Sequence, residues 1–87
     1  MKLKLSAVGN PDRGQPRNIG IKTEWVEVAD LKQASEVCRE FIRVNNLGSG
    51  NWTGGEVKGS SGETVAQISY NGRAWKAGKG IQEEVIL

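Results

Sequence analysis

The sequence predicts a single α+β domain in which one helix packs on one face of an antiparallel sheet, with the element order β-β-α-β-β-β. Three observations predict this fold. Apolar and polar residues alternate near the start of the chain, one central segment has helical periodicity, and two glycine-rich turn signals divide the second half. The 87 residues suffice for one hydrophobic core, so residues 1–87 are interpreted as one domain.

Two strands are expected before the helix. In residues 1–8 apolar side chains occupy every second position, which is typical of a half-buried strand. Residues 9–18 contain both prolines and are expected to form an exposed loop. Residues 19–28 form the second strand, with Trp25 on its buried face. The apolar phase shifts at Val26, which indicates either a bulge near Trp25 or burial of both faces there.

The helix is expected over residues 30–45. Asp30 is suited to cap its first turn, and Gln33 three residues later completes a variant of the capping box. The pair Asn45-Asn46 tolerates the left-handed conformation that ends many helices. The apolar residues of this segment follow helical spacing and predict one buried face: Leu31, Ala34, Val37, Cys38, Phe41 and Ile42.

The first glycine-rich turn after the helix is expected at residues 59–62. If these four residues form a hairpin loop, Lys58 lies opposite Glu63 in an opposite-charge pair, and Val57 lies opposite Thr64. The turn therefore predicts two antiparallel strands that continue into a three-stranded meander.

The second turn is signalled by Asn71-Gly72, the preferred pair for a two-residue type I′ turn. That turn places Tyr70 opposite Arg73 and Ile68 opposite Trp75. The two hairpin registers agree on the residues that share one sheet face: Val57, Thr64, Ala66, Ile68, Tyr70, Arg73 and Trp75. Trp75 is therefore expected in the core.

The composition argues against several kinds of chemistry. The chain has no histidine, which removes the commonest general base and metal ligand, and its one cysteine, Cys38, falls on the buried helix face. The glycine-rich run 48–55 follows a helix, whereas a phosphate-binding loop precedes one. We therefore expect no catalysis, no cofactor and no metal site. No apolar run approaches the roughly 20 residues of a membrane span, and the alternating N-terminal segment MKLKLSAVGN lacks the continuous apolar stretch of a signal peptide. We therefore expect a cytoplasmic protein with no membrane contact.

The predicted sheet has only one helix to cover it, so one of its faces is expected to meet solvent or a partner. The sequence therefore favours a binding module for another protein, with Trp52, Tyr70 and Arg73 as the candidate contacts. Trp52 has no periodic partner and fits two roles equally, a plug at the end of the core or an exposed interface anchor. The short apolar strand expected at IQEEVIL could also pair with a second copy of the chain in a homodimer.

The alternative is a nucleic-acid-binding module. The net charge of +2 is only mildly basic, but basic residues concentrate in the first long loop and around the last hairpin. They would form one cationic rim near Tyr70 if these segments meet at one end of the sheet. Ordinary solubilising charge explains the same residues. The residues concerned are Arg13, Arg17, Arg73, Lys76 and Lys79.

The runs WTGGEV at 52–57 and ISYNGR at 68–73 resemble segments of small uncharacterised bacterial proteins encoded by phages or plasmids. Compact proteins of that kind include inhibitors of host defence, anti-CRISPR proteins among them. The resemblance implies binding without catalysis, and it assigns a role to no single residue.

Overall fold

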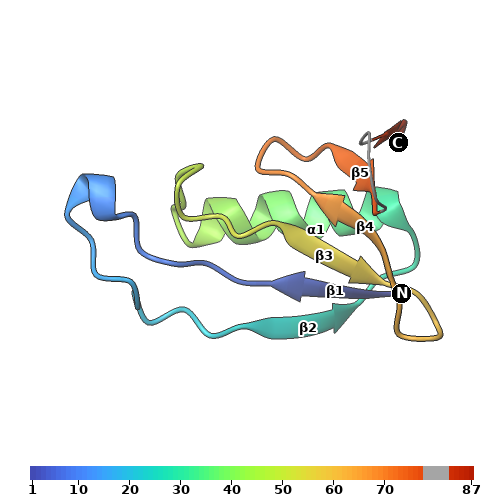
Figure 1. Ribbon diagram of the computed structural model, residues 1–87, viewed down its shortest axis with the longest axis horizontal. Helices are drawn as coiled ribbons and strands as arrows, with labels where there is room; N and C mark the ends of the chain where they lie inside the picture. Colours follow the sequence, from blue (N-terminus) through green and yellow to red (C-terminus); the bar gives the residue numbers. More distant parts are fainter. Residues whose placement is uncertain (78–82) are drawn as a thin grey trace.

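The computed structural model describes residues 1–77 and 83–87, which form one open antiparallel sheet with one helix across one face (Figure 1). The strand order is β2-β1-β3-β4-β5-β6. The predicted fold class and element order are confirmed, with a short 3-10 helix, η1, added in the first loop. The elements are β1 (Lys2–Leu5), η1 (Pro11–Arg13), β2 (Glu24–Glu27), α1 (Leu31–Val44), β3 (Gly55–Lys58), β4 (Thr64–Ile68), β5 (Ala74–Lys76) and β6 (Glu84–Val85).

Strand β1 lies between β2 and β3 and is antiparallel to both. Strands β2 and β3 therefore run parallel to each other, and the chain between them contains α1. This connection places α1 on one face of the sheet (Figure 1). No described helix or strand covers the other face.

The helix begins and ends within one residue of the predicted positions because its caps form as expected. The side chain of Asp30 accepts a hydrogen bond from the Gln33 amide at 2.8 Å, and the Gln33 side chain accepts one from the Ala29 amide at 2.6 Å. At the other end Asn46 has a φ of 52°, and the Leu47 amide donates to the carbonyl of Ile42.

The main core lies between α1 and the sheet, and small residues dominate its centre. An ideal Cβ placed on Gly55 would come within 2.7 Å of the Cys38 sulfur, so the helix passes very close to β3. Ala66 and Ala74 on the neighbouring strands are fully buried beneath the same helix. The buried residues of this core are Leu3, Leu5, Val28, Ala34, Cys38, Val57, Ala66, Ile68 and Ala74.

Both hairpins have three-residue loops, and the predicted loop lengths are wrong. The Gly59 amide donates to the Glu63 carbonyl, and the Ser69 amide donates to the Arg73 carbonyl, each at 2.9 Å. The third loop residue is a glycine with positive φ in both cases, which is the geometry of a type I turn followed by a bulge. The pair Asn71-Gly72 therefore occupies the last two loop positions instead of the whole turn.

The first loop is one residue shorter than predicted, and this changes the β3–β4 register. Lys58 lies opposite Thr64 instead of Glu63, and the register shifts again so that Val57 lies opposite Ala66. The predicted inward positions of Val57 and Ala66 are nevertheless right, because both are fully buried.

The longer second loop reverses the faces of β5. Ile68 lies opposite Ala74, and Trp75 lies opposite Gln67 on the face away from the helix. The prediction that Trp75 belongs to the core is therefore wrong. The position that the prediction gave to Trp75 in the core is occupied by Ala74, which is fully buried.

The second strand is shorter than predicted, and Trp25 is not buried. Trp25 lies opposite Lys4 on the uncovered face and is 43% exposed, whereas Val26 lies opposite Leu3 on the helix face.

The segment before β2 contributes two isoleucines to a second small cluster near the end of α1, which contains Ile19, Ile21, Ala7, Ile42 and Leu47.

Candidate binding surface on the open sheet face

The surface of the sheet opposite α1, which we call the open face, carries two tryptophans in one cross-strand row. Trp25 on β2 pairs with Lys4 on β1, and Gln67 on β4 pairs with Trp75 on β5. Glu56 pairs with Gln67 and continues the row on β3. Paired residues of antiparallel strands point to the same side, so all of these side chains share the open face.

The two indoles mark opposite ends of a broad surface. Four strand-to-strand steps separate β2 from β5 in the sheet order. At about 4.8 Å per step, Trp25 and Trp75 lie about 19 Å apart along the row. The row spans most of the width of the sheet.

Lys2 and Lys58 lie directly opposite each other on β1 and β3. Among the described residues neither forms an ion pair, although other cations of the chain do. The Lys58 ammonium lies 4.9 Å from the centre of the Trp25 ring, in a cation–π contact. Like charges directly opposite in a sheet are unfavourable, and Glu27, which lies opposite Lys2 on β2, is the acidic neighbour of this lysine pair.

A hollow of about 630 Å³ opens beside this lysine pair. Its wall includes the β3–β4 turn and the start of the chain, where the terminal amine lies 3.5 Å from a carboxylate oxygen of Glu27. That contact offsets the acidic group in the wall. The residues lining the hollow are Met1, Lys2, Trp25, Glu27, Lys58, Gly59, Ser60 and Gly62.

Trp52, a predicted contact, closes one end of the core. Its indole nitrogen donates to the Ile68 carbonyl at 3.0 Å, and its ring centre lies 5.9 Å from that of Phe41. Its backbone also bridges to Ala7. Of the two roles that the sequence left open, these contacts favour the plug.

Tyr70 is likewise tied to the fold. Its hydroxyl donates to the Leu47 carbonyl at 3.1 Å, and Arg39 of α1 lies over its ring and donates to its carbonyl. The Ser35 hydroxyl donates to the Gly72 carbonyl at 2.6 Å. The hairpin tip is thus docked on the helix.

The basic residues of β5 and the preceding turn face acidic partners. Arg73 lies 3.9 Å from a carboxylate oxygen of Glu84, and Lys76 lies 3.4 Å from one of Glu83. The side chains of Arg73, Lys76 and Glu83 are largely exposed and that of Glu84 is 35% exposed, so these pairs contribute little stability, but they offset the positive charge there. Lys79 lies outside the described residues.

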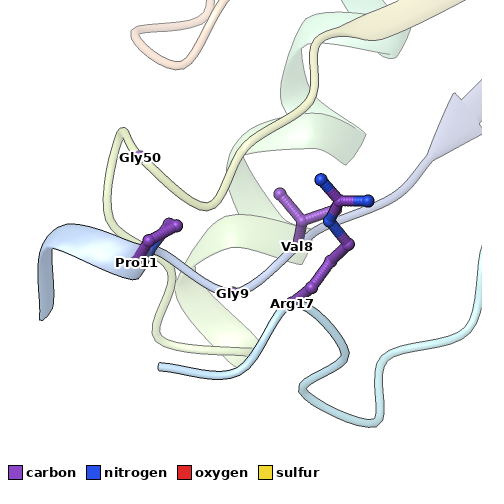
Figure 2. Close-up of a pocket in the computed structure, with 5 residues that line it drawn as sticks. All are labelled: Val8, Gly9, Pro11, Arg17 and Gly50. Carbon is purple, nitrogen blue, oxygen red and sulfur yellow. The ribbon is translucent and has the colours of Figure 1, made fainter. Parts of the chain in front are cut away.

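Arg13 and Arg17 lie in the first loop, at the opposite end of the molecule's long axis from β5 (Figure 1). The two groups of basic residues are therefore not brought together as one rim. Figure 2 shows the side chain of Arg17 beside Val8, where a second hollow of about 470 Å³ opens between the first loop and Gly50.

The first loop is held in place by a buried side chain. Asn51 is 4% exposed, and its amide nitrogen donates to the Val8 carbonyl and to the Gln15 side chain, each at 2.9 Å. Its side-chain oxygen accepts from the Gly48 amide. The loop that carries Arg13 and Arg17 is therefore fastened to the segment after α1.

Cys38 is fully buried, and burial raises the pKa of its thiol to about 12. A thiol in that environment stays protonated and makes a poor nucleophile.

Within residues 1–77 and 83–87, no group of three or more acidic, cysteine or histidine side chains is placed to hold a metal ion. Over the same residues, no helix is both long and apolar enough to cross a membrane.

Sequence reasoning missed the open-face site because it assigned both tryptophans to the core. The alternation in residues 1–8 does place Lys2 and Lys4 outward. Their proximity to Lys58 and Trp25 depends on the pairing of β1 with two strands distant in sequence.

Comparisons with protein-family models, with curated proteins and with solved structures found no match to this chain.

Proposed function

We propose that this protein is a non-enzymatic binding module that holds a partner protein on its open face. One observation carries the proposal: Trp25 and Trp75 share a row on a sheet face that no described element covers. Tryptophan is enriched among the residues that dominate binding energy at protein interfaces. Trp25 and Trp75 therefore replace Trp52 and Tyr70 as the proposed interface residues, because Trp52 and Tyr70 form hydrogen bonds within the fold.

The pattern of charge favours a protein over a nucleic acid. Glu56 lies within the row, and Glu84 pairs with Trp75 at its end. A strand of nucleic acid carries a phosphate at every nucleotide, so one that crossed the row would pass these carboxylates. A protein surface can place neutral or basic groups there instead.

The resemblance to phage- and plasmid-encoded proteins supplies a hypothesis for the partner, a component of host defence in the cytoplasm. A second copy of this chain is another candidate partner. In an antiparallel pairing of two β2 edges centred on this strand, Glu24 of one copy would lie opposite Glu27 of the other, which is unfavourable. A homodimer would therefore use β6 or the open face itself.

The experiment is affinity capture from a lysate of the source organism before and after nuclease treatment, followed by mass spectrometry. The captured protein is then purified, and its Kd is measured for the wild type and for Trp25→Ala with Trp75→Ala. We expect the double variant to weaken binding at least tenfold, because truncated interface tryptophans cost roughly 2 kcal/mol or more. Sedimentation equilibrium of the protein alone tests for the homodimer.

The matched control is Arg13→Gln with Arg17→Gln, which removes the basic loop residues and leaves the open face intact. Circular dichroism confirms that each variant is folded. If the control pair weakens binding and the tryptophan pair does not, or if nuclease treatment abolishes capture, the proposal is wrong and the basic-loop alternative gains support.

A further inference from the structure

We infer that the hollow beside Trp25 is the anchoring subsite of the open face and binds a carboxylate side chain from an acidic segment of the partner protein. The inference rests on the proposed function and specifies the chemistry of the partner. Lys2 and Lys58 would pair with the carboxylate, and the Trp25 ring would contact the apolar part of the same segment.

The first support is the unrelieved charge. Lys2 and Lys58 face each other across two strands, and in the described structure no carboxylate lies within 4.0 Å of either ammonium. Glu27 lies opposite Lys2 on β2, but its carboxylate contacts the terminal amine at 3.5 Å instead. An arrangement that is unfavourable in the free protein becomes favourable when an anion lies between the two ammonium groups.

The second support is the prior placement of one lysine. Lys58 is half-buried and lies over the Trp25 ring, so its ammonium is held at the wall of the hollow before any ligand arrives. A group ordered in advance loses less freedom on binding. The volume of about 630 Å³ falls in the range of small-ligand sites and accommodates an acidic side chain with its neighbours.

The third support concerns the class of anion. Glu27 lies in the wall of the hollow and Glu56 lies further along the open face. One carboxylate can lie between the lysines, beside Glu27 whose charge the terminal amine offsets, without approaching Glu56. A chain of successive phosphates along the open face would also pass Glu56. The hollow therefore suits an isolated acidic side chain better than a polyanion.

The test uses ¹⁵N-labelled protein titrated with three probes. These are the capped peptide acetyl-Gly-Glu-Leu-Glu-Gly-amide, the same peptide with Gln in place of Glu, and a six-nucleotide oligothymidylate. We expect the acidic peptide to shift the Trp25 indole resonance and the amides of Lys2, Lys58 and Ser60. The Gln peptide should produce no such shifts, and the oligonucleotide should produce weaker ones.

The decisive variant is Lys2→Glu. It places opposite charges across β1 and β3 but like charges across β1 and β2, where residue 2 lies opposite Glu27. These two changes oppose each other, so the stability should stay close to that of the wild type while peptide binding is lost. The milder pair Lys2→Gln with Lys58→Gln should weaken peptide binding about fivefold to tenfold. Lys22→Gln with Lys32→Gln, which removes two exposed lysines elsewhere, should leave it unchanged.

The inference is overturned if Lys2→Glu binds the acidic peptide as well as the wild type does, or if the oligonucleotide shifts the same resonances more strongly. Its failure is distinguishable from failure of the proposed function. If the captured protein still depends on Trp25 and Trp75 while the peptide does not bind, the open face stands as the interface and the carboxylate subsite is wrong. If capture is independent of both tryptophans, the proposed function fails, and the subsite loses its basis with it.

Discussion

The indole nitrogen of Trp52 donates a hydrogen bond to the main-chain carbonyl of Ile68 at 3.0 Å. The bond joins the segment after α1 to the end of β4 and fixes the indole against Phe41. Trp52, the tryptophan of the glycine-rich segment after α1, therefore stabilises the fold.

Trp52→Phe should lower the free energy of unfolding by about 1–3 kcal/mol, because the Ile68 carbonyl loses its donor in a half-buried position. Urea denaturation measures the loss. Trp75→Phe is the matched control and should stay within about 0.5 kcal/mol of the wild type, since Trp75 lies outside the core. A Trp52→Phe protein of normal stability that no longer binds its partner would instead identify Trp52 as an interface anchor.

Gly72→Ala should destabilise the protein more than Gly62→Ala. Both glycines end equivalent hairpin loops with φ of +86° and +84°, so both substitutions incur the cost of a left-handed alanine, about 1 kcal/mol. At Gly72 the new methyl group would also lie 3.0 Å from the Ser35 hydroxyl, whereas nothing lies within 4 Å at Gly62. Thermal denaturation of the two variants side by side tests this, and equal losses would show that the hairpin tip is not docked on α1.

Asn51→Ala should lower the free energy of unfolding by about 2–4 kcal/mol. The Val8 carbonyl and the Gly48 amide would both lose their partner, and each is a polar group near the buried Asn51 side chain. Limited proteolysis should then cut within residues 9–18 faster than in the wild type. Ser49→Ala, an exposed change in the same turn, should leave both measurements nearly unchanged.

Asp30→Ala should lower the free energy of unfolding by about 1 kcal/mol, because the Gln33 amide loses its capping acceptor at the start of α1. Chemical denaturation measures the loss, and Asp30→Asn should restore most of it since asparagine caps equally well. If Asp30→Asn were as unstable as Asp30→Ala, the negative charge and not the hydrogen bond would be responsible.

Stability should fall at alkaline pH through Cys38. Its pKa is about 12 in the folded protein and about 8.5 in an unfolded chain, so the unfolded state releases the proton first. The raised pKa therefore favours unfolding as the pH rises: stability is complete below about pH 8.5 and declines toward pH 12, by at most about 1.4 kcal/mol per pH unit.

Urea midpoints at pH 8 and pH 10 for the wild type and Cys38→Ala isolate this effect, because other groups titrate equally in both proteins. The variant should be less stable at pH 8, where it lacks the buried sulfur, and should lose less stability on going to pH 10. Parallel losses in the two proteins would mean that the thiol ionises in the folded state as readily as in the unfolded chain.

The helix and the order of the elements along the chain could be predicted because they depend on local signals. Asp30, Gln33 and the helical spacing of apolar residues act within a few positions of each other. The faces of β5 could not be predicted in the same way. Asn71-Gly72 fits two turns, and they differ in whether Ala74 or Trp75 lies on the core face of β5.

Prediction of the candidate site required the correct turn type at Asn71-Gly72 and the pairing of strands that are distant in the sequence. With Trp25 and Trp75 both assigned to the core, the sequence predicts an open face that meets solvent or a partner but places neither tryptophan on it. The lysine pair is formed by residues 2 and 58, which local periodicity cannot bring together. The outward alternation of Lys2 and Lys4 was the only part of the site visible in the sequence.

The central position of β1 also has a consequence during synthesis. Strand β1 is synthesised before β2 and β3, and β2 can pair with one of its edges early. The other edge of β1 stays unpaired until β3 (Gly55–Lys58) has left the ribosome. Throughout that interval the nascent chain exposes a free strand edge and the apolar side chains of Leu3 and Leu5, both buried in the finished fold. Chaperone dependence and aggregation during expression should therefore respond most strongly to changes that delay the arrival of β3.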